Sequence, residues 1–281
     1  MTIRSYLYAP GNRPDLLGKV LGKEADAVIL DLEDAVPPAE KAKARGIVSD
    51  FLASATGATL LVRLNSGAEA LADLDGLTVR GLRGVLLPKA EDAELIRAID
   101  RLLSAREEAA AVPSGSIIVQ PLIESVAGLY ALDAMAAASP RIRRFAFGAG
   151  DFVRDLRAEP TPARLETLYA RQHLVARSRF LRLKAPVAHV FMPVRDLDAL
   201  RRACQEDRAL GFHGRSCIHP AQVPIVNDVF QHGAEEIARA RTILAAYADA
   251  MREGRGALVL DDGTFVDEAI AARARDILAG A

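Results

Sequence analysis

Short apolar runs that end in charged residues recur along this chain, and they constrain its fold more than any other feature. The runs AVILDLED, LLVRLN, GVLLPKAE and IIVQPLIE occupy residues 27–34, 60–65, 84–91 and 117–124. None alternates strictly between apolar and polar residues, which is typical of strands that are covered on both faces. Because the charges follow the apolar residues, parallel packing would place them on one rim, where the chemistry of a parallel barrel is found.

Helical stretches separate the apolar runs, so the chain alternates between strand and helix. We predict eight strands, at about residues 3–9, 27–32, 60–65, 84–88, 117–123, 143–149, 186–192 and 213–218. The stretches between them are rich in Ala, Leu, Glu and Arg, and Gly211 stands in the position of a helix C-cap. This alternation predicts an α/β protein with a (β/α)8 TIM barrel. A doubly wound dinucleotide fold is less favoured, because no glycine-rich phosphate fingerprint follows the first strand.

The segment after the eighth predicted strand is not needed to close a barrel. We expect residues 1–225 to form the TIM-barrel catalytic domain and residues 226–281 to form a C-terminal extension. The extension contains a predicted helix at about 234–253, a short strand in ALVL, a turn at Asp261–Asp262–Gly263 and a final helix.

Composition excludes several classes of function. The chain has 281 residues, a net charge of −1 and 51% hydrophobic residues, so no global field would draw it to nucleic acid or to anionic lipid. The two cysteines, Cys204 and Cys217, have no paired spacing and are expected to be reduced thiols. No apolar run is long enough to span a bilayer, and a strand beginning near Ile3 leaves no room for a signal peptide. We therefore expect a cytoplasmic protein with no membrane or nucleic-acid partner.

Glu124 and Asp151 each follow an apolar strand, and the two strands are consecutive. Neighbouring parallel strands lie roughly 4.8 Å apart, so carboxylates at adjacent strand ends can share one cation. Two oxygen ligands with open positions suit Mg²⁺ or Mn²⁺. Alternatively, Glu124 caps the next helix and Asp151 pairs with Arg154 or Arg143. The neighbouring glycines of GAG (148–150) favour the metal site, because small residues let a ligand approach the backbone.

Arg63 ends the third predicted strand, and its planar guanidinium matches a carboxylate in bidentate fashion. We expect it to anchor an acidic substrate or a developing oxyanion. The acidic group Asp31, Glu33 and Asp34 follows the second strand, and such close acids need partners such as Arg63, Lys89 or the waters of a metal. Glu33 and Asp34 could instead simply begin the next helix. Asp31 is expected to support substrate binding.

Lys89 suggests an alternative mechanism, because a lysine at the mouth of a barrel can form a Schiff base with a carbonyl substrate. The carboxylate pair argues against such a metal-free aldolase, and we expect Lys89 to neutralise the acidic group and to help bind substrate. His219 could line the rim or make a structural hydrogen bond. The other histidines have no spacing suited to zinc.

Taken together and in order, several motifs are similar to those of the citrate lyase β-subunit-like proteins of the HpcH/HpaI aldolase superfamily. The resemblance runs from about residue 4 to residue 278. Its motifs are RSYLYAPGNRPDLL (4–17), AVILDLEDAVPPAEKAKAR (27–45), VRLNS (62–66), LLPKAE (86–91), PLIESVAGL (121–129), FGAGDFVRDL (147–156) and GFHGRSCIHPAQVPIV (211–226).

The resemblance implies a trimeric or hexameric TIM barrel that uses Mg²⁺ to make or break a C–C bond next to a CoA thioester. By motif match, Glu124 and Asp151 correspond to the magnesium ligands and Arg63 to the substrate-binding arginine. The element GTFVD resembles the family motif G-x-M-[VI]-D, and its aspartate, here Asp267, would complete the site of a neighbouring subunit as general acid/base. The chain departs from the family at Ala188–His189, where relatives commonly have Ile-Asp, and at Phe265 and Glu268, which flank Asp267.

We therefore expect a lyase with Glu124, Arg63 and Asp267 as catalytic residues. Its substrate would be a 3-hydroxyacyl-CoA such as malyl-, citramalyl- or citryl-CoA, and its products an acyl-CoA and a 2-oxo acid. Three alternatives stay open: a thioesterase for the same substrates, a Schiff-base aldolase that uses Lys89, and a silent β subunit that requires an acyl carrier protein.

Overall fold

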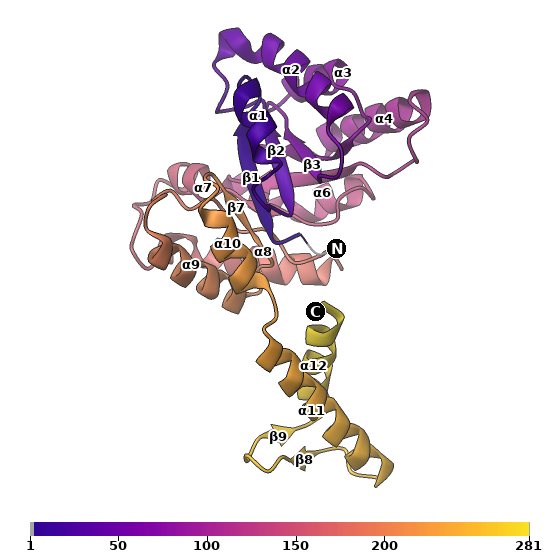
Figure 1. Ribbon diagram of the computed structural model, residues 1–281, viewed down its shortest axis with the longest axis vertical. Coiled ribbons are helices and arrows are strands. Elements are labelled where there is room, and N and C mark those ends of the chain that lie inside the picture. The colour runs from indigo at the N-terminus through magenta and orange to yellow at the C-terminus, as the bar shows by residue number, and fades with distance from the viewer. Residues whose placement is uncertain (1–2, 281) are drawn as a thin grey trace. The chain divides into compact units, whose positions relative to one another are not determined.

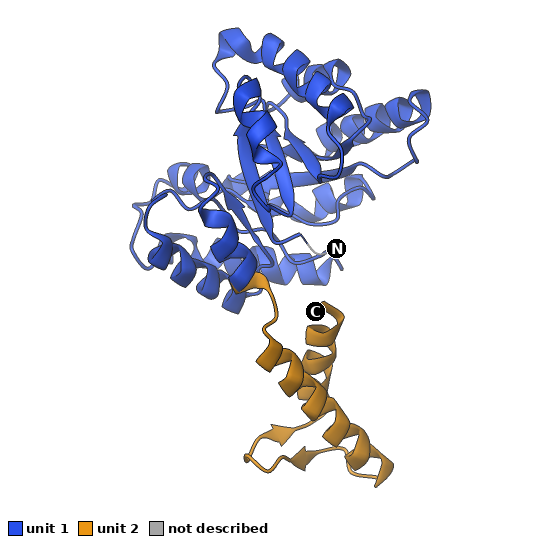
Figure 2. Ribbon diagram, in the orientation of Figure 1, with its two compact units in different colours: residues 1, 3–228 blue, residues 2, 229–281 orange. Residues whose placement is uncertain are grey.

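The computed structural model describes residues 3–280, and Figure 1 shows the order of its elements. The described chain forms two compact units, one of Ile3–Asp228 and one that begins at Val229 (Figure 2). The predicted C-terminal extension, residues 226–281, corresponds mainly to the second unit. Its role in a neighbouring subunit's site stays a prediction. Among the described residues, no helix combines the length and the apolar composition that a membrane crossing requires.

The first unit is built on a seven-stranded sheet in which every neighbouring pair is parallel, in the order β6-β5-β4-β3-β2-β1-β7. Its strands are β1 Ser5–Pro10, β2 Ala27–Asp31, β3 Leu60–Arg63, β4 Leu82–Leu87, β5 Ile118–Ile123, β6 Ala146–Phe147 and β7 Arg215–Cys217. The predicted α/β class and parallel order are confirmed.

Helices connect consecutive strands, as parallel pairing requires. They are α1 Pro14–Val20, α2 Lys41–Ser54, α3 Glu69–Gly76, α4 Ala93–Ala109, α5 Val126–Tyr130, α6 Leu132–Ala138, α7 Ala149–Leu156, α8 Leu168–Phe180 and α9 Leu197–Leu210. A further helix, α10 Gln222–Phe230, follows β7. Gly211 caps α9 with a φ of 102°, a left-handed conformation that glycine adopts without strain, so this predicted cap is confirmed.

The predicted strand at 186–192 is not a strand of the described sheet. Only isolated parallel bridges form there, between Val187 and Ala146 of β6 and between Ala188 and Arg215 of β7. Val187 accepts from the backbone N–H of Phe147, and Ala188 accepts from that of Ser216. The bridges are confined to two residues. The carbonyl of Pro186 before them accepts from the His213 N–H, but Pro186 has no N–H to donate in return. The structure therefore shows a curled sheet of seven strands where we expected eight.

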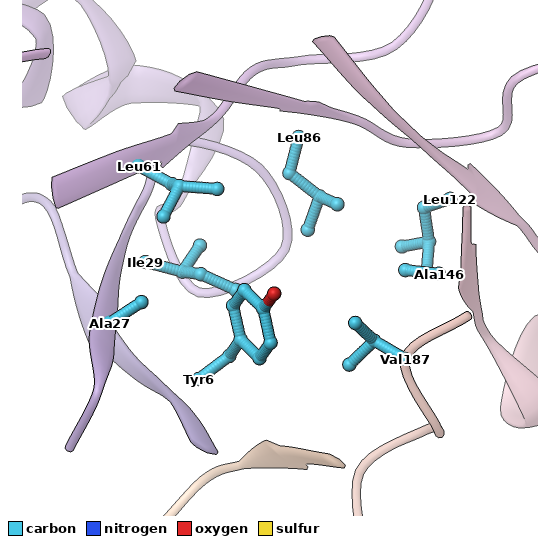
Figure 3. Close-up of a cluster of buried hydrophobic side chains, with 8 residues drawn as sticks. All are labelled: Tyr6, Ala27, Ile29, Leu61, Leu86, Leu122, Ala146 and Val187. Carbon is cyan, nitrogen blue, oxygen red and sulfur yellow. The ribbon is translucent and has the colours of Figure 1, made fainter. Parts of the chain in front are cut away.

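A cluster of apolar side chains fills the space that the curled sheet encloses (Figure 3). Each strand from β1 to β6 and the segment at 187 contributes to it, with Tyr6, Ala27, Ile29, Leu61, Leu86, Leu122, Ala146 and Val187. Alternate residues such as Ala27 and Ile29 point inward because side chains on a strand alternate between its faces. The core therefore lies directly beneath the C-terminal strand ends.

The second unit has its own small core. Its elements are α11 Ala234–Arg252, the antiparallel pair β8 Leu258–Val259 and β9 Phe265–Val266, and α12 Glu268–Gly280. Tyr247, Val266 and Ala271 are buried together between these elements. Gly263 has a φ of 81° in the turn between β8 and β9. The predicted helices, strand and turn of this segment are confirmed.

Leu86→Ala should destabilise the first unit by about 2–5 kcal/mol, because Leu86 is 1% exposed and its truncation leaves a cavity in the enclosed cluster. Urea unfolding of the purified protein measures this change. Leu165→Ala is the matched control, since Leu165 is 64% exposed and its truncation should cost much less. Equal effects of the two substitutions would contradict the assignment of this cluster as the core.

Candidate active site

Charged side chains from successive strands meet around one cavity of about 480 Å³ in the first unit. Asp31 ends β2, Arg63 ends β3, Glu124 follows β5 and Asp151 lies in the first turn of α7, after β6. All four line the cavity. Asp31 and Arg63 are direct register partners in β2 and β3, so the sheet itself places them side by side. The structure thus brings together the predicted residues of the rim.

Arg63 is held by carboxylates and by an aromatic ring. Its Nε and Nη2 donate to the two carboxylate oxygens of Asp31 at 2.7 and 2.6 Å, and its Nη1 lies 2.8 Å from Glu33 Oε2. The guanidinium lies over the ring of Tyr8, 5.0 Å from its centroid. Burial alone would lower the pKa of Arg63, but the bonds to Asp31 raise it above its ordinary value. Arg63 is therefore a fixed, permanent cation at the cavity wall.

Both carboxylate oxygens of Asp31 are engaged in hydrogen bonds with Arg63. Its carboxylate also accepts the backbone N–H groups of Glu33 at 2.9 Å and of Ala35 at 3.2 Å. Four donors therefore fix its two oxygens. This geometry supports the guanidinium in one orientation and is consistent with the supporting role we expected, which stays a prediction.

Lys89 bridges the acidic residues of the rim. Its Nζ lies 2.6 Å from Glu33 Oε1 and 4.0 Å from Asp151 Oδ2. Burial would lower the pKa of Lys89, but the hydrogen bond to Glu33 and the nearby carboxylates raise it above its ordinary value. A Schiff base requires a neutral amine, so these contacts disfavour the aldolase alternative. They fit the expected neutralising role.

The backbone of Lys89 positions Glu124. The Lys89 N–H donates to Glu124 Oε1 at 2.6 Å, and Lys89 adopts a φ of 45°, in the left-handed region that costs energy for a residue with a side chain. On the other side, a Cβ atom at Gly148 would lie 2.6 Å from Glu124 Oε2. The absence of a side chain at Gly148 therefore makes room for this carboxylate.

The environment of Glu124 disfavours its charged form. Burial raises its pKa to about 7, the hydrogen bond from Lys89 opposes this shift, and the Glu33 and Asp151 carboxylates add to it. A bound cation would stabilise the ionised form of such a group. The alternative role for Glu124 as a helix cap is not supported, because Ser125 caps α5 by accepting from the Gly128 N–H.

Two carboxylates on one cavity wall fit a hard divalent cation that takes its other ligands from water or substrate oxygens. The described residues contain no group of three or more His, Cys, Asp or Glu side chains arranged around a metal. Glu124 and Asp151 are the ligands that the sequence predicts for such an ion, and both line the cavity. Asp151 also lies 2.9 Å from Arg154, the ion pair that we weighed as its alternative role. The ligand assignment stays a prediction.

Sequence reasoning assigned no role in the cavity to three polar residues that line it. They are Tyr8 of β1, Ser216 of β7 and His189, which was named only as a departure from the family. Tyr8 is an aromatic residue in an apolar run, which is typical of a core position, and His189 lacks any ligand-like spacing. The inward register of Tyr6 predicts that Tyr8 faces the same side two residues later.

Asp267 belongs to the second unit. Its Oδ1 accepts the backbone N–H of Ile270 at 3.0 Å, so it caps the start of α12. The described residues that line the cavity all belong to the first unit. The predicted role of Asp267 in the site of another subunit therefore stays a prediction.

The sequence of this chain is also similar to those of known proteins. The profile of the family described as HpcH/HpaI aldolase/citrate lyase matches residues 4–220. A citrate lyase subunit beta-like protein of Deinococcus radiodurans is 35% identical over 285 residues, with 98% of this chain and 96% of the relative covered. A (3S)-malyl-CoA thioesterase of Cereibacter sphaeroides is 34% identical, with 99% and 94% covered.

A solved structure is also similar over nearly the whole chain. It is the protein CitE of Mycobacterium tuberculosis in complex with magnesium, acetoacetate and coenzyme A. The two share 27% sequence identity and a TM-score of 0.77, with 99% of this chain and 97% of CitE covered. The chain is therefore a member of the HpcH/HpaI aldolase/citrate lyase family.

Proposed function

We propose that this protein is a Mg²⁺-dependent carbon–carbon lyase that acts on a 3-hydroxyacyl-CoA. Malyl-, citramalyl- and citryl-CoA are the candidate substrates, and the products are an acyl-CoA and a 2-oxo acid. One observation carries the proposal: Arg63, Glu124 and Asp151 line one cavity in a chain similar to a protein solved with magnesium, acetoacetate and coenzyme A.

Glu124 and Asp151 would hold the magnesium ion, or manganese in its place. Bound there, the metal supplies Lewis-acid stabilisation of negative charge on substrate oxygens. The protein contributes the orientation of these ligands. The Lys89 N–H fixes one oxygen of Glu124, and Gly148 leaves space beside the other.

Arg63 would bind the carboxylate of the substrate or the enolate oxygen of the thioester as it develops. Asp31 and the Tyr8 ring hold the guanidinium in place before substrate arrives, which reduces the reorganisation needed during the reaction. Lys89 adds a second positive charge at the rim through its ion pair with Glu33.

We further propose that the segment at 186–192 takes the place of a strand between β6 and β7, which would complete a (β/α)8 barrel. Its bridges to β6 and β7 support this role. Residues 1–225 would form the catalytic domain. Residues 226–281 would supply Asp267 to the site of a neighbouring copy, where it exchanges a proton with the acyl carbon. Exposed Met251, Val259 and Phe265 on the second unit support a homo-oligomer, a trimer or hexamer, because contact with another copy would bury them.

Hydrolysis of the same thioesters is the second candidate function, favoured by the similarity to a (3S)-malyl-CoA thioesterase. A β subunit that needs an acyl carrier protein is the third, favoured by the similarity to citrate lyase subunits beta. The two buried free cysteines, Cys204 and Cys217, support a reducing compartment such as the cytoplasm.

Product analysis tests the reaction type. With (3S)-malyl-CoA and Mg²⁺, we expect glyoxylate and acetyl-CoA, because the role proposed for Arg63, which lines the cavity, is to stabilise the enolate that C–C cleavage forms. Chromatography of the CoA species separates this outcome from hydrolysis, which gives free CoA and malate. Glu124→Gln and Asp151→Asn should each lower the metal-dependent rate at least ~100-fold. Full activity of either variant after chelator treatment would refute the metal site.

Arg63→Lys should lower kcat/KM about 100- to 1000-fold, because lysine keeps the charge but loses the planar, bidentate geometry that Asp31 and Tyr8 orient. Steady-state kinetics measures the loss, and a melting curve checks that the variant is folded. Arg97→Lys, at an exposed ion pair with Glu94, is the control and should behave as wild type. Equal activity of the two variants would contradict the role of Arg63.

The raised pKa of Glu124 predicts a pH dependence in the metal-free protein. The folded state binds a proton on the Glu124 carboxyl group more tightly than the unfolded chain does. The resulting contribution to the free energy of unfolding is complete below about pH 4.5 and is lost as pH rises through about 7. The loss is on the order of 3 kcal/mol at most, and Mg²⁺ should reverse it. Urea unfolding of wild type and Glu124→Gln from pH 5 to 8, with Glu94→Gln as the exposed control, measures the difference. A wild-type profile parallel to that of Glu124→Gln would contradict the prediction.

A further inference from the structure

Tyr8 lies at the floor of the cavity, one inward-facing layer below the charged rim. It is the register partner of Ile29 of β2, whose side chain belongs to the enclosed apolar cluster. Two residues later, Pro10 is the register partner of Asp31. Side chains two residues apart on a strand face the same way, so Tyr8 follows Tyr6, which points into the cluster (Figure 3). Tyr8 therefore stands between the apolar core and the cavity, which it lines.

The hydroxyl group of Tyr8 is open to the cavity. The residue is partly exposed. No hydrogen bond joins its hydroxyl to another described residue, and the oxygen is not among the buried polar atoms that lack a partner. The Tyr6 hydroxyl below it, by contrast, accepts from Arg144 Nη1 at 3.0 Å. The Tyr8 oxygen therefore keeps accessible surface, and a ligand in the cavity can reach it.

The charges that act on this hydroxyl are those of the rim. The guanidinium carbon of Arg63 lies 5.0 Å from the centroid of the Tyr8 ring, a contact that orients the ring. Burial raises the pKa of Tyr8, and the charge of Arg63 opposes this shift. The carboxylates of Asp31, Glu124 and Glu33 raise the pKa further. The phenol therefore keeps its proton across the physiological pH range and offers an uncharged O–H donor among these groups.

Arg63 alone offers few free donors to a ligand. Its Nε and Nη2 donate to Asp31, and its Nη1 lies 2.8 Å from Glu33 Oε2, so each nitrogen already contacts a carboxylate. The two carboxylates also offset the positive charge of the guanidinium. Sites that stabilise a developing oxyanion aim several fixed donors at it. The hydroxyl of the ring that packs against Arg63 meets this need for a second donor.

We propose that Tyr8 is a catalytic residue whose hydroxyl donates a hydrogen bond to the oxyanion that develops on the substrate, an inference that rests on the proposed lyase function. As the C–C bond breaks, its electron pair moves to the acyl carbon, and negative charge collects on the thioester oxygen. The Tyr8 O–H and a free N–H of Arg63 donate to that oxygen. The phenol transfers no proton. The acyl carbon receives its proton from the general acid proposed above.

Removal of the hydroxyl alone tests this role. Tyr8→Phe keeps the ring that packs against Arg63, whereas Tyr8→Leu removes the ring as well. Tyr169→Phe is the matched control, because Tyr169 is 59% exposed and lies outside the cavity. For each protein, kcat and KM for (3S)-malyl-CoA are measured with Mg²⁺, and calorimetry gives the dissociation constant of acetyl-CoA. A melting curve measures the folded fraction.

We expect Tyr8→Phe to lower kcat about 100-fold, because the lost donor acts on charge that is present only in the transition state. KM and the dissociation constant of acetyl-CoA should change less than about threefold, since ground-state binding is retained. Tyr8→Leu should lower kcat further, because Arg63 also loses its support. Tyr169→Phe should behave as wild type.

An unchanged kcat in Tyr8→Phe would overturn the inference. A loss confined to KM, or a fall in kcat no larger than the fall in folded fraction, would overturn it equally. Hydrolysis of malyl-CoA by the wild-type protein would overturn the proposed lyase function instead. The kcat of Tyr8→Phe would still decide the role of the hydroxyl, because hydrolysis also develops charge on the thioester oxygen. A wild-type protein that neither cleaves nor hydrolyses malyl-CoA would overturn both.

Discussion

The charge balance of the rim is the constraint on which the rest of the site depends. The carboxylates of Asp31, Asp34, Glu124 and Asp151 line one cavity, and Glu33 lies beside them. The cations that they meet are Arg63, Lys89 and Arg154. Asp31 and Glu33 are neutralised by direct contacts. Asp151 is paired with Arg154, whereas Glu124 is held by the backbone N–H of Lys89, and burial of uncompensated charge is costly. The pKa of Glu124 is raised because its charged form is disfavoured in this environment, and a bound divalent cation would stabilise that charged form.

Sequence reasoning could predict this rim because the positions of its residues follow from strand direction alone. Once AVILD and LLVR are assigned as neighbouring parallel strands, Asp31 and Arg63 must end at the same edge, and the register shows them as partners. The elements of the second unit could also be predicted, because local residue types mark them. Gly263 lies in the turn, and Asp267 caps the start of the last helix.

Other features depend on contacts that no local pattern encodes. The left-handed backbone of Lys89 is unusual for a residue with a side chain, and only the buried Glu124 explains it. The segment at 186–192 has strand-like composition, yet its pairing stops after residues 187 and 188. His189 stood out in the sequence only as a departure from the family, because the residues that contact it, Arg215 and Phe147, lie far from it along the chain.

Lys89 connects two parts of the rim through chemically independent atoms. Its amide hydrogen engages Glu124, while its ammonium group engages Glu33. Only the second contact depends on which amino acid occupies the position. A change of this side chain would therefore alter the charge at the rim while the backbone contact to Glu124 remains. A glycine would relieve the unfavourable torsion, but it would leave the Glu33 carboxylate without the ammonium group that pairs with it.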